Sequence, residues 1–452
     1  MMHIKKIFPN KLRLLLVPLK NTSTVTILVL VKVGSKYETK RINGISHFLE
    51  HLFFKGTKKR PSKIDIGKEF DSIGGEYNAF TSQEYTGFYA KVNFVHSKIA
   101  LDVLSDMLLN SKFNSEDIDN ERNVIIEEIN MYQDMPMEYV DTLWHKLLYG
   151  DQPAGWDIAG AKTTVGKIGR NDILNFYKKY YTAGNIVVCV SGNLEAVEKI
   201  MIKEKHACAL LARAGADRKG KAGNYKNLVR AISDYFCYDE NFSGENRKEK
   251  VKILQVQPEI HLKYKKTDQT HLRLGVRGYD MFHKDRFAIK LLSIILGGGM
   301  SSRLFLEIRE NRGLAYYVYT RAESDSDSGY LVTGAGLDNN KVLSAVEVIL
   351  AEYRKIKIEA VSTEEFKKAK DYLKGKMSLN LESSDEWANF TASQELLRKE
   401  VLSLNDIFAK IERVRLADIQ RVANDIFMNN KLNMAIIGPF KDVSKFEQIL
   451  KI

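Results

Sequence analysis

The sequence predicts an α+β protein with two homologous domains, each a mostly antiparallel β-sheet with helices packed against it. Its length of 452 residues exceeds what one compact core usually holds and suits two domains. Hydrophobic residues make up 44% and charged residues 28%, which is the balance of a folded globular chain. The two halves of the chain also end in stretches of similar pattern, which points to a duplicated unit.

The repeated pattern is a helix followed by a strand. The first half ends in NDILNFYKKYYTAGNIVVCVSGN, and the second half ends in ADIQRVANDIFMNNKLNMAIIGP. In both stretches an Asp-Ile pair opens an amphipathic helix, and an apolar strand then runs into a glycine. The interval from Asp172 to Gly192 equals that from Asp418 to Gly438. We therefore expect two related domains that arose by duplication.

The domains are expected at residues 1–202 and 251–452, joined by a basic linker at residues 203–250. Within this linker, residues 203–230 shift to Ala, Gly, Lys and Arg, which predicts an insertion with a short helix and a flexible Gly-Lys loop. The next boundary is expected near Gly244. Only the first domain carries this polar set, because the second copy has Leu and Ile where the first has His and Glu.

The first elements of the chain are predicted to be strands. The apolar run of the first 20 residues, MMHIKKIFPNKLRLLLVPLK, is interrupted by charged residues and prolines. This pattern predicts two short strands around a turn at Pro9-Asn10 and not a signal peptide. VTILVLVKV, the most apolar stretch, is rich in β-branched residues and far too short to span a membrane. It therefore predicts a buried strand.

Composition narrows the cellular setting and the partners. Three cysteines without a CxxC spacing favour a reducing, cytoplasmic location over a disulfide framework. The net charge of +12 would suit an acidic partner, but the Lys and Arg residues are scattered among Asp and Glu at helical spacing. We therefore expect neither a nucleic-acid partner nor a membrane partner.

The chemistry concentrates in residues 43–57, NGISHFLEHLFFKGT. On a helix, His47 and His51 lie four residues apart and project from one face, so two imidazole nitrogens can converge on one ion. Glu50 lies on the neighbouring edge of that face, where it can approach a water molecule at the metal without being a ligand. This arrangement predicts a catalytic metal site with zinc as the expected ion.

A catalytic zinc ion takes three protein ligands and leaves one position for water, so a third ligand is needed. The helix predicted in SEDIDNERNVIIEEINMYQ offers Glu121 and Glu128, which lie seven residues apart and hence on one face. Glu127 is rotated away by about 100°. We expect Glu128 to be the third ligand and Glu121 to orient a ligand from outside.

An ordinary buried helix with two hydrogen-bonded histidines would show the same spacing. However, Ile45, Phe48, Leu52 and Phe53 already make the helix apolar, and packing gains nothing from three ionisable groups in its middle. The sequence therefore favours the metal site over a purely structural helix.

HFLEHLFFKGT is the inverted zinc motif H-x-x-E-H, and it resembles that of the insulinase, pitrilysin and mitochondrial processing peptidase family. The resemblance covers nearly the whole chain apart from residues 203–230 and is to half-length, bacterial processing-protease-like members. In that family the two histidines and a glutamate about 77 residues further on bind zinc, which leads to Glu128 here. The resemblance implies a zinc endopeptidase with one zinc ion per chain and Glu50 as general base, acting on peptides or unfolded segments.

Two further stretches resemble segments of that family. GGEYNAFTSQEYTGFYAKV resembles the edge strand that pairs with an extended substrate, which implies that Asn78, Ala79 and Phe80 lie beside the scissile bond. Without the resemblance, a plain hairpin strand would explain this stretch equally well. GGGMSSRLFLEIRENRGLAYYVYT resembles the segment in which an arginine and a tyrosine hold the substrate backbone and polarise its carbonyl, here Arg309 and Tyr316.

The chain resembles one half of the double-length family members, whose halves close a clamshell chamber. The resemblance therefore implies a homodimer, or a heterodimer with a related chain, in which Arg309 and Tyr316 of one subunit face the zinc ion of the other. The basic insertion, and Asn10-Lys11 where members often carry Asn-Gly, depart from the family pattern. A catalytically silent scaffold or core subunit is the alternative, but its signature would be lost ligands, and all of them are present.

Overall fold

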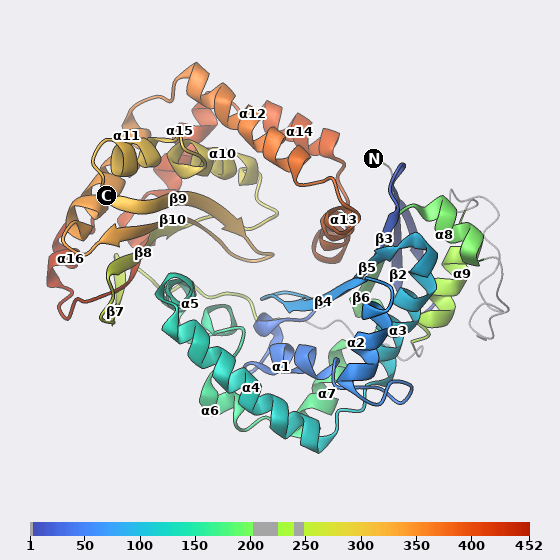
Figure 1. Cartoon of the computed structure of the whole chain (residues 1–452). Helices are drawn as coiled ribbons and strands as arrows, with labels where there is room; N and C mark the ends of the chain where they lie inside the picture. Colours follow the sequence, from blue (N-terminus) through green and yellow to red (C-terminus); the bar gives the residue numbers. More distant parts are fainter. Residues whose placement is uncertain (1–2, 202–224, 239–247) are drawn as a thin grey trace. The chain divides into compact units, whose positions relative to one another are not determined.

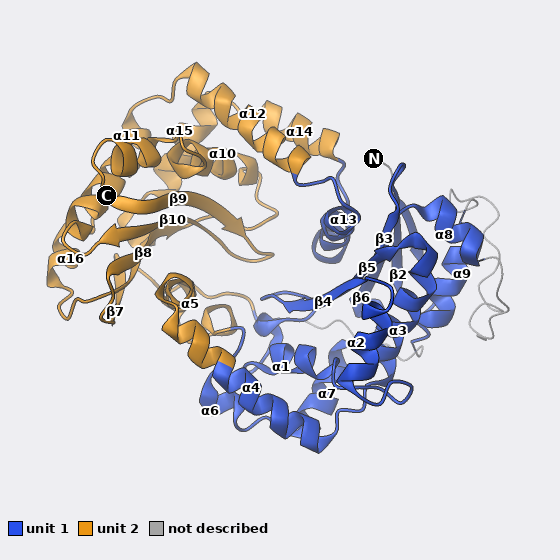
Figure 2. Cartoon of the chain, in the orientation of Figure 1, with its two compact units in different colours: residues 1–127, 158–249, 380–403 blue, residues 128–157, 250–379, 404–452 orange. Residues whose placement is uncertain are grey.

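The computed structural model describes residues 3–201, 225–238 and 248–452 (Figure 1). Most of the insertion predicted at residues 203–230, with its helix and loop, lies outside the described residues, as does the boundary predicted near Gly244. The chain forms two compact units (Figure 2). Unit 1 consists of residues 1–127, 158–249 and 380–403, and unit 2 consists of residues 128–157, 250–379 and 404–452.

Unit 1 is built on a six-stranded sheet in the order β1-β2-β6-β3-β5-β4. In this sheet β2 and β6 run parallel, and the other neighbouring pairs are antiparallel. β4 forms one edge, where it pairs with β5. The strands are β1 (Ile4–Ile7), β2 (Arg13–Pro18), β3 (Thr24–Val31), β4 (Glu76–Thr81), β5 (Thr86–Asn93) and β6 (Ile186–Gly192).

The first strands lie where the sequence predicts them. β1 and β2 pair around the turn at Pro9-Asn10, where the Asn10 side chain accepts a hydrogen bond of 3.1 Å from the Leu12 N–H. β3 holds the most apolar stretch and is buried from Val25 onward. Its β-branched residues suit a strand that is covered on both faces.

Helices lie on both faces of the unit 1 sheet (Figure 1). On one face α13, which comes from the second half of the sequence, packs Ala388, Ala392 and Leu396 against a core that includes Leu28 and Leu30. On the other face, α3 packs against β3 and β5. The helices of this unit are α1 (Ile45–Leu52), α2 (Lys63–Asp71), α3 (Ser97–Asn110), α4 (Ser115–Asp134, which continues into unit 2), α6 (Lys162–Val165), α7 (Arg170–Tyr180), α8 (Leu194–Met201), α9 (Lys226–Tyr235) and α13 (Ser384–Arg398).

Unit 2 repeats this arrangement on a five-stranded sheet in the order β7-β11-β8-β10-β9, in which β7 and β11 are parallel. Helix α5, from the first half of the sequence, packs Val140 and Trp144 against a core that includes Val332 and Ile437. The strands are β7 (Glu259–Tyr264), β8 (Gln269–Arg277), β9 (Ala315–Ser324), β10 (Gly329–Asp338) and β11 (Leu432–Gly438). The helices are α5 (Pro136–Tyr149), α10 (Arg286–Gly297), α11 (Val342–Ile358), α12 (Thr363–Leu379), α14 (Leu404–Arg413), α15 (Leu416–Ile426) and α16 (Ser444–Ile449).

The repeated pattern of the sequence is confirmed as α7 followed by β6 and as α15 followed by β11. Asp172 and Asp418 play the same part in both copies. Each carboxylate accepts a hydrogen bond from the N–H just before its helix, at 3.1 and 2.9 Å respectively. Gly192 has a φ of +139° and lies against the Thr24 carbonyl, where a side chain would clash. The Asp and Gly of the pattern therefore have local structural causes.

Two mostly antiparallel sheets, each flanked by helices, confirm the predicted α+β class with two related domains. The domain limits at residues 202 and 250 stay a prediction, because α5 and α13 each belong to the unit built mainly from the other half of the sequence. Among the described helices, none is long and apolar enough to cross a bilayer.

Candidate metal centre

Helix α1 carries the central motif and has only eight residues. Phe48, Leu49 and Leu52 are fully buried and hold the helix against the core of unit 1. His47 and His51 are partly exposed, as is Glu50. The packing side chains and the polar motif therefore occupy different sides of one short helix.

The three predicted metal ligands come together in the structure. A nitrogen of His47, a nitrogen of His51 and a carboxylate oxygen of Glu128 all lie within 4.8 Å of one another. The Nε2 atoms of the two histidines are 3.2 Å apart. When two imidazole nitrogens bind the same tetrahedral zinc ion, each at about 2.1 Å, the two nitrogens lie about 3.4 Å apart. The spacing and the chemistry of these donors therefore fit zinc.

The charge state of His47 also suits a metal ligand. Burial, together with the neighbouring His51, lowers the pKa of His47 from 6.5 to about 3. The imidazole is therefore neutral at neutral pH. It keeps a lone pair for an ion, which metal binding requires.

Glu121 belongs to α4 and contacts the ring nitrogen of His51 that is not directed at His47. The Nδ1 atom of His51 is 2.8 Å from Oε1 of Glu121, and Lys55 forms an ion pair with the other oxygen of the same carboxylate. Burial raises the pKa of Glu121, but hydrogen bonds from His51 and Lys55 outweigh it, so the pKa lies below its usual value. An ionised Glu121 accepts a hydrogen bond from the Nδ1–H group of His51, which leaves the Nε2 lone pair of His51 directed at His47.

Glu50 is anchored by strand β4. The hydroxyl of Thr81 donates a hydrogen bond of 2.5 Å to Oε2 of Glu50. Thr81 ends the same strand that contains Asn78, Ala79 and Phe80. These three residues pair with β5 on one side, and the other side of β4 is the edge of the sheet. The structure thus joins the glutamate of the motif to the strand expected to bind substrate.

Arg309 and Tyr316, the other two predicted site residues, lie in unit 2. Arg309 belongs to a π-helix, Phe305–Glu310, and its guanidinium lies 5.0 Å from the centre of the Phe305 ring. π-helices are rare and frequently occur at functional sites. Tyr316 is on the edge strand β9 and is 74% exposed. Both side chains are therefore exposed on unit 2.

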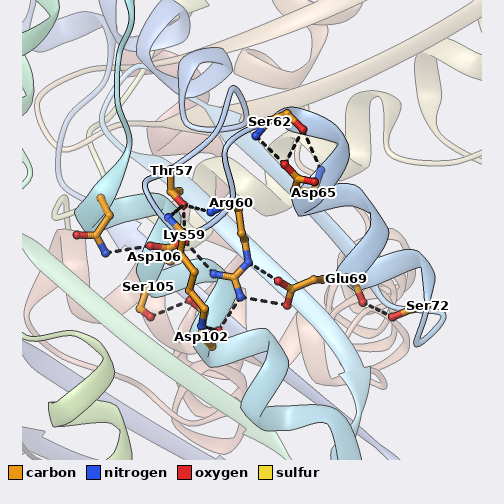
Figure 3. A network of polar contacts seen from close by, with 11 residues as sticks. Thr57, Lys59, Arg60, Ser62, Asp65, Glu69, Ser72, Asp102, Ser105 and Asp106 are labelled. Atoms are coloured by element: carbon orange, nitrogen blue, oxygen red, sulfur yellow. Dashed lines mark hydrogen bonds and ion pairs between the residues drawn. The ribbon is translucent and has the colours of Figure 1, made fainter.

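The segment that follows α1 is fixed by Arg60. Its side chain is 3% exposed and donates hydrogen bonds to Glu69 of α2 and to Asp102 and Asp106 of α3 (Figure 3). Thr57 donates a further hydrogen bond of 2.5 Å to Asp106. This network ties the chain beyond the C-terminal end of α1 to two helices.

Lys55 and Thr81 are not among the residues that the motifs single out. Lys55 lies four residues after His51 but beyond the end of α1 at Leu52, so helical spacing does not place it beside Glu121. Thr81 is 31 residues away from Glu50 in the sequence, and only the position of β4 beside α1 brings the two together. No pattern in the local sequence predicts the contact between Thr81 and Glu50.

Two sheet-and-helix domains of one pattern, with an H-x-x-E-H helix in the first, carry the motif of the inverted-motif class of zinc peptidases. Comparison with known families agrees. The sequence profile of the insulinase domain, peptidase family M16, matches residues 13–162, and that of the peptidase M16 inactive domain matches residues 167–373. The chain belongs to the insulinase family, peptidase family M16, as the resemblance predicts.

Relatives match the chain over almost its full length. An uncharacterised zinc protease of Bacillus subtilis strain 168 is 34% identical over 436 residues, which are 95% of this chain and 97% of that protein. An uncharacterised zinc protease of Streptomyces coelicolor is also 34% identical, over 96% of this chain and 89% of that protein. The predicted half-length membership of the family is therefore confirmed.

Solved structures share the fold. A protease from Helicobacter pylori superposes with a TM-score of 0.84 at 24% identity and covers 97% of this chain and 99% of its own. The peptidase M16 inactive domain from Pseudomonas fluorescens gives a TM-score of 0.82 at 16% identity and covers 98% of this chain and 99% of its own. At these identities the likeness shows the fold alone.

Proposed function

We propose that this chain is a zinc-dependent endopeptidase that hydrolyses peptides or unfolded, extended polypeptide segments. The observation that carries the proposal is the convergence of His47, His51 and Glu128 within 4.8 Å, with Glu50 on the same helix as the two histidines. Names given to relatives support it, because the Bacillus subtilis and Streptomyces coelicolor proteins are described as zinc proteases.

His47, His51 and Glu128 would hold one zinc ion per chain. When bound, zinc polarises a carbonyl group and lowers the pKa of water toward neutrality. Glu121 keeps the proton of His51 on Nδ1, so that Nε2 is available to the ion. Glu50 takes the proton of the attacking water and later delivers it to the leaving amine, a role that requires reach first and a suitable pKa second. Thr81 holds the carboxylate of Glu50 in place for both transfers.

Substrate binding is assigned to the edge strand β4. An extended peptide adds to such an edge through main-chain hydrogen bonds, and pockets for alternate side chains provide preference. Asn78, Ala79 and Phe80 would lie beside the scissile bond, immediately before Thr81. The geometry supports this assignment, because the residue that holds Glu50 and the residues that would hold the peptide share one strand.

Arg309 and Tyr316 would hold the substrate backbone and stabilise the oxyanion. The resemblance to one half of the double-length family members implies that Arg309 and Tyr316 act on the zinc site of a second subunit. The two subunits would form a homodimer, or a heterodimer with a related chain, that closes a clamshell chamber. The expected location of this assembly is the cytoplasm. Sedimentation of the purified protein together with activity tests the assembly. A dimer is expected, and a fully active monomer would contradict it.

The proposed activity is tested by mass-spectrometric detection of cuts in a mixed peptide library. Wild type and Glu50→Gln are each assayed with and without a chelator. Cuts are expected only from the metal-loaded wild type, whereas Glu50→Gln is expected to bind zinc without turnover. Near-full activity of Glu50→Gln would contradict the mechanism. Absence of cuts by zinc-loaded wild type would favour the silent scaffold or a missing partner chain.

A further inference from the structure

A buried carboxyl group lies at the first turn of α1. Glu38 is 4% exposed, and its Oε2 atom accepts hydrogen bonds from the backbone N–H of Gly44 at 2.7 Å and from the Asn43 side chain at 2.9 Å. Its Oε1 atom accepts a hydrogen bond of 2.8 Å from the backbone N–H of Ser46. Ser46 immediately precedes His47, so Glu38 contacts the backbone next to the first metal ligand.

The start of α1 needs such an acceptor from elsewhere in the chain. The first N–H groups of a helix have no partner within the helix and are usually satisfied by a Ser, Thr, Asp or Asn side chain at the capping position. Here the capping position is Gly44, with a φ of +98°. A side chain at Gly44 would also meet the Ala159 carbonyl oxygen at 2.6 Å. Because this position admits only glycine, Glu38 supplies the missing cap.

The segment that carries Glu38 also contacts the end of β4. The N–H of Ser35 donates to the Ser82 carbonyl at 3.3 Å, and that of Lys36 donates to the Gln83 carbonyl at 2.9 Å. Ser82 follows Thr81, which holds Glu50. One short segment, residues 35–38, thus touches both the start of the helix with the histidines and the turn beyond the strand that anchors the general base.

We infer that Glu38 is a positioning residue of the metal centre, which fixes the first turn of α1 and thereby the direction from which His47 reaches the ion. The inference rests on the proposed zinc site. It assigns to a buried glutamate outside the motif a role that packing alone would not require, because an apolar side chain would fill the same space but leave the N–H groups of Gly44 and Ser46 without an acceptor.

Glu395 provides a matched control. It is likewise a buried glutamate of unit 1, and its carboxylate pairs with Lys5 at 2.7 Å and Arg13 at 3.7 Å. It belongs to α13, which packs against β2, β3 and β6. Glu395→Gln therefore changes a buried carboxyl group elsewhere in unit 1 and leaves the residues that contact the start of α1 intact.

The experiment measures metal binding and stability separately from activity. Zinc dissociation constants are obtained by chelator competition for wild type, Glu38→Ala, Glu38→Gln and Glu395→Gln. Visible absorption of the Co²⁺-loaded proteins reports ligand geometry, and thermal melts report stability. Both Glu38 variants are expected to bind zinc about 10- to 100-fold more weakly than wild type and to show an altered Co²⁺ spectrum. Glu395→Gln is expected to melt earlier but to keep the wild-type zinc affinity and spectrum.

The outcomes separate the inference from the proposed function. If Glu38→Ala does not fold, Glu38→Gln carries the test, because it keeps the size of the side chain and one acceptor oxygen. Wild-type zinc affinity and spectrum in Glu38→Gln would overturn the inference while leaving the peptidase proposal intact. Absence of zinc binding by the wild type would overturn both.

Discussion

Glu127 and Glu128 are neighbours on α4, yet among the described residues only Glu128 groups with His47 and His51. Replacing Glu128 by Gln keeps the size of the side chain and removes the charge that a carboxylate ligand supplies. We expect Glu128→Gln to weaken zinc binding by about tenfold or more, as measured by chelator competition. Glu127→Gln is the matched control and should bind zinc as the wild type does. An equal loss in both variants would contradict the assignment of Glu128.

Thr81 directs the carboxylate of Glu50 through its hydroxyl, at 2.5 Å. A hydrogen bond to a charged group contributes about 1.5–3 kcal/mol. Thr81→Val keeps the branched shape but loses the donor, so we expect kcat to fall about tenfold or more while zinc content stays unchanged. Thr81→Ser keeps the hydroxyl and should stay close to wild type. Equal kcat values for the Val and Ser variants would show that the hydrogen bond does not matter.

The ligand residues could be predicted because their signal is local. Helical spacing alone places His47 and His51 on one face, and it leaves Glu128 as the favoured glutamate on a second helix. Helical spacing does not predict that these two helices meet, and that expectation rests on the family resemblance. No sequence pattern indicates a role for Glu38, because it lies nine residues before His47 and is not part of the same helical repeat. Its contact depends on the left-handed turn at Gly44, which a sequence pattern does not report.

At the scale of elements, Arg60 joins three parts of unit 1: the segment after α1, helix α2 and helix α3 (Figure 3). Its side chain is 3% exposed. Removing one partner of such a buried network leaves uncompensated charges, so Arg60→Met should lower the free energy of unfolding by about 3 kcal/mol or more. Urea denaturation measures this. Arg41→Met, which breaks the exposed pair of Arg41 with Asp172, should change the free energy of unfolding far less than Arg60→Met does.

The same network makes a prediction about pH. Burial raises the pKa of Asp102, but hydrogen bonds from Lys59 and Arg60 outweigh it and hold the pKa below its ordinary value of 3.8. As pH falls, the Asp102 carboxylate is therefore protonated at a higher pH in the unfolded chain than in the folded protein. The stabilisation from Asp102 is present above about pH 4 and is lost as pH falls through the lower value in the folded state. Below about pH 4 the stability of Arg60→Met should therefore fall less steeply than that of wild type.

Regular elements were more predictable than irregular ones. The helix-strand pattern at the end of each half follows from apolar periodicity, and Asp172 and Asp418 mark the helix starts because they accept hydrogen bonds there. The π-helix Phe305–Glu310 was not predicted. Its apolar spacing is that of an ordinary helix, and the wider hydrogen-bond register depends on packing that the local sequence does not encode.

At the scale of the whole molecule, each unit draws one helix from the other half of the sequence (Figure 2). α13 covers Leu28 and Leu30 in unit 1, and α5 covers Val332 and Ile437 in unit 2. Separate fragments of residues 1–202 and 251–452 would each expose an apolar sheet face, so each alone should aggregate. Co-expression should give a soluble complex. Size-exclusion chromatography decides this, and two fragments that fold alone would contradict the exchange.

The repeat in the sequence predicted two related domains but not this exchange of helices. Periodicity shows that α5 and α13 are helices with an apolar side, because that signal is local. It does not show which sheet each helix covers, since that contact spans hundreds of residues: Glu395 of α13 pairs with Lys5, at a separation of 390 residues. Long-range partner choice is therefore the part of the fold that the sequence alone left open.

The most direct test of the account is zinc-edge anomalous diffraction from crystals of the protein grown with zinc. The account predicts an anomalous peak about 2.1 Å from Nε2 of His47, Nε2 of His51 and a carboxylate oxygen of Glu128. Glu121 should remain in contact with Nδ1 of His51. A peak bound by other residues, or no peak at these three ligands in the presence of zinc, would contradict the central claim that this helix pair forms a catalytic zinc site.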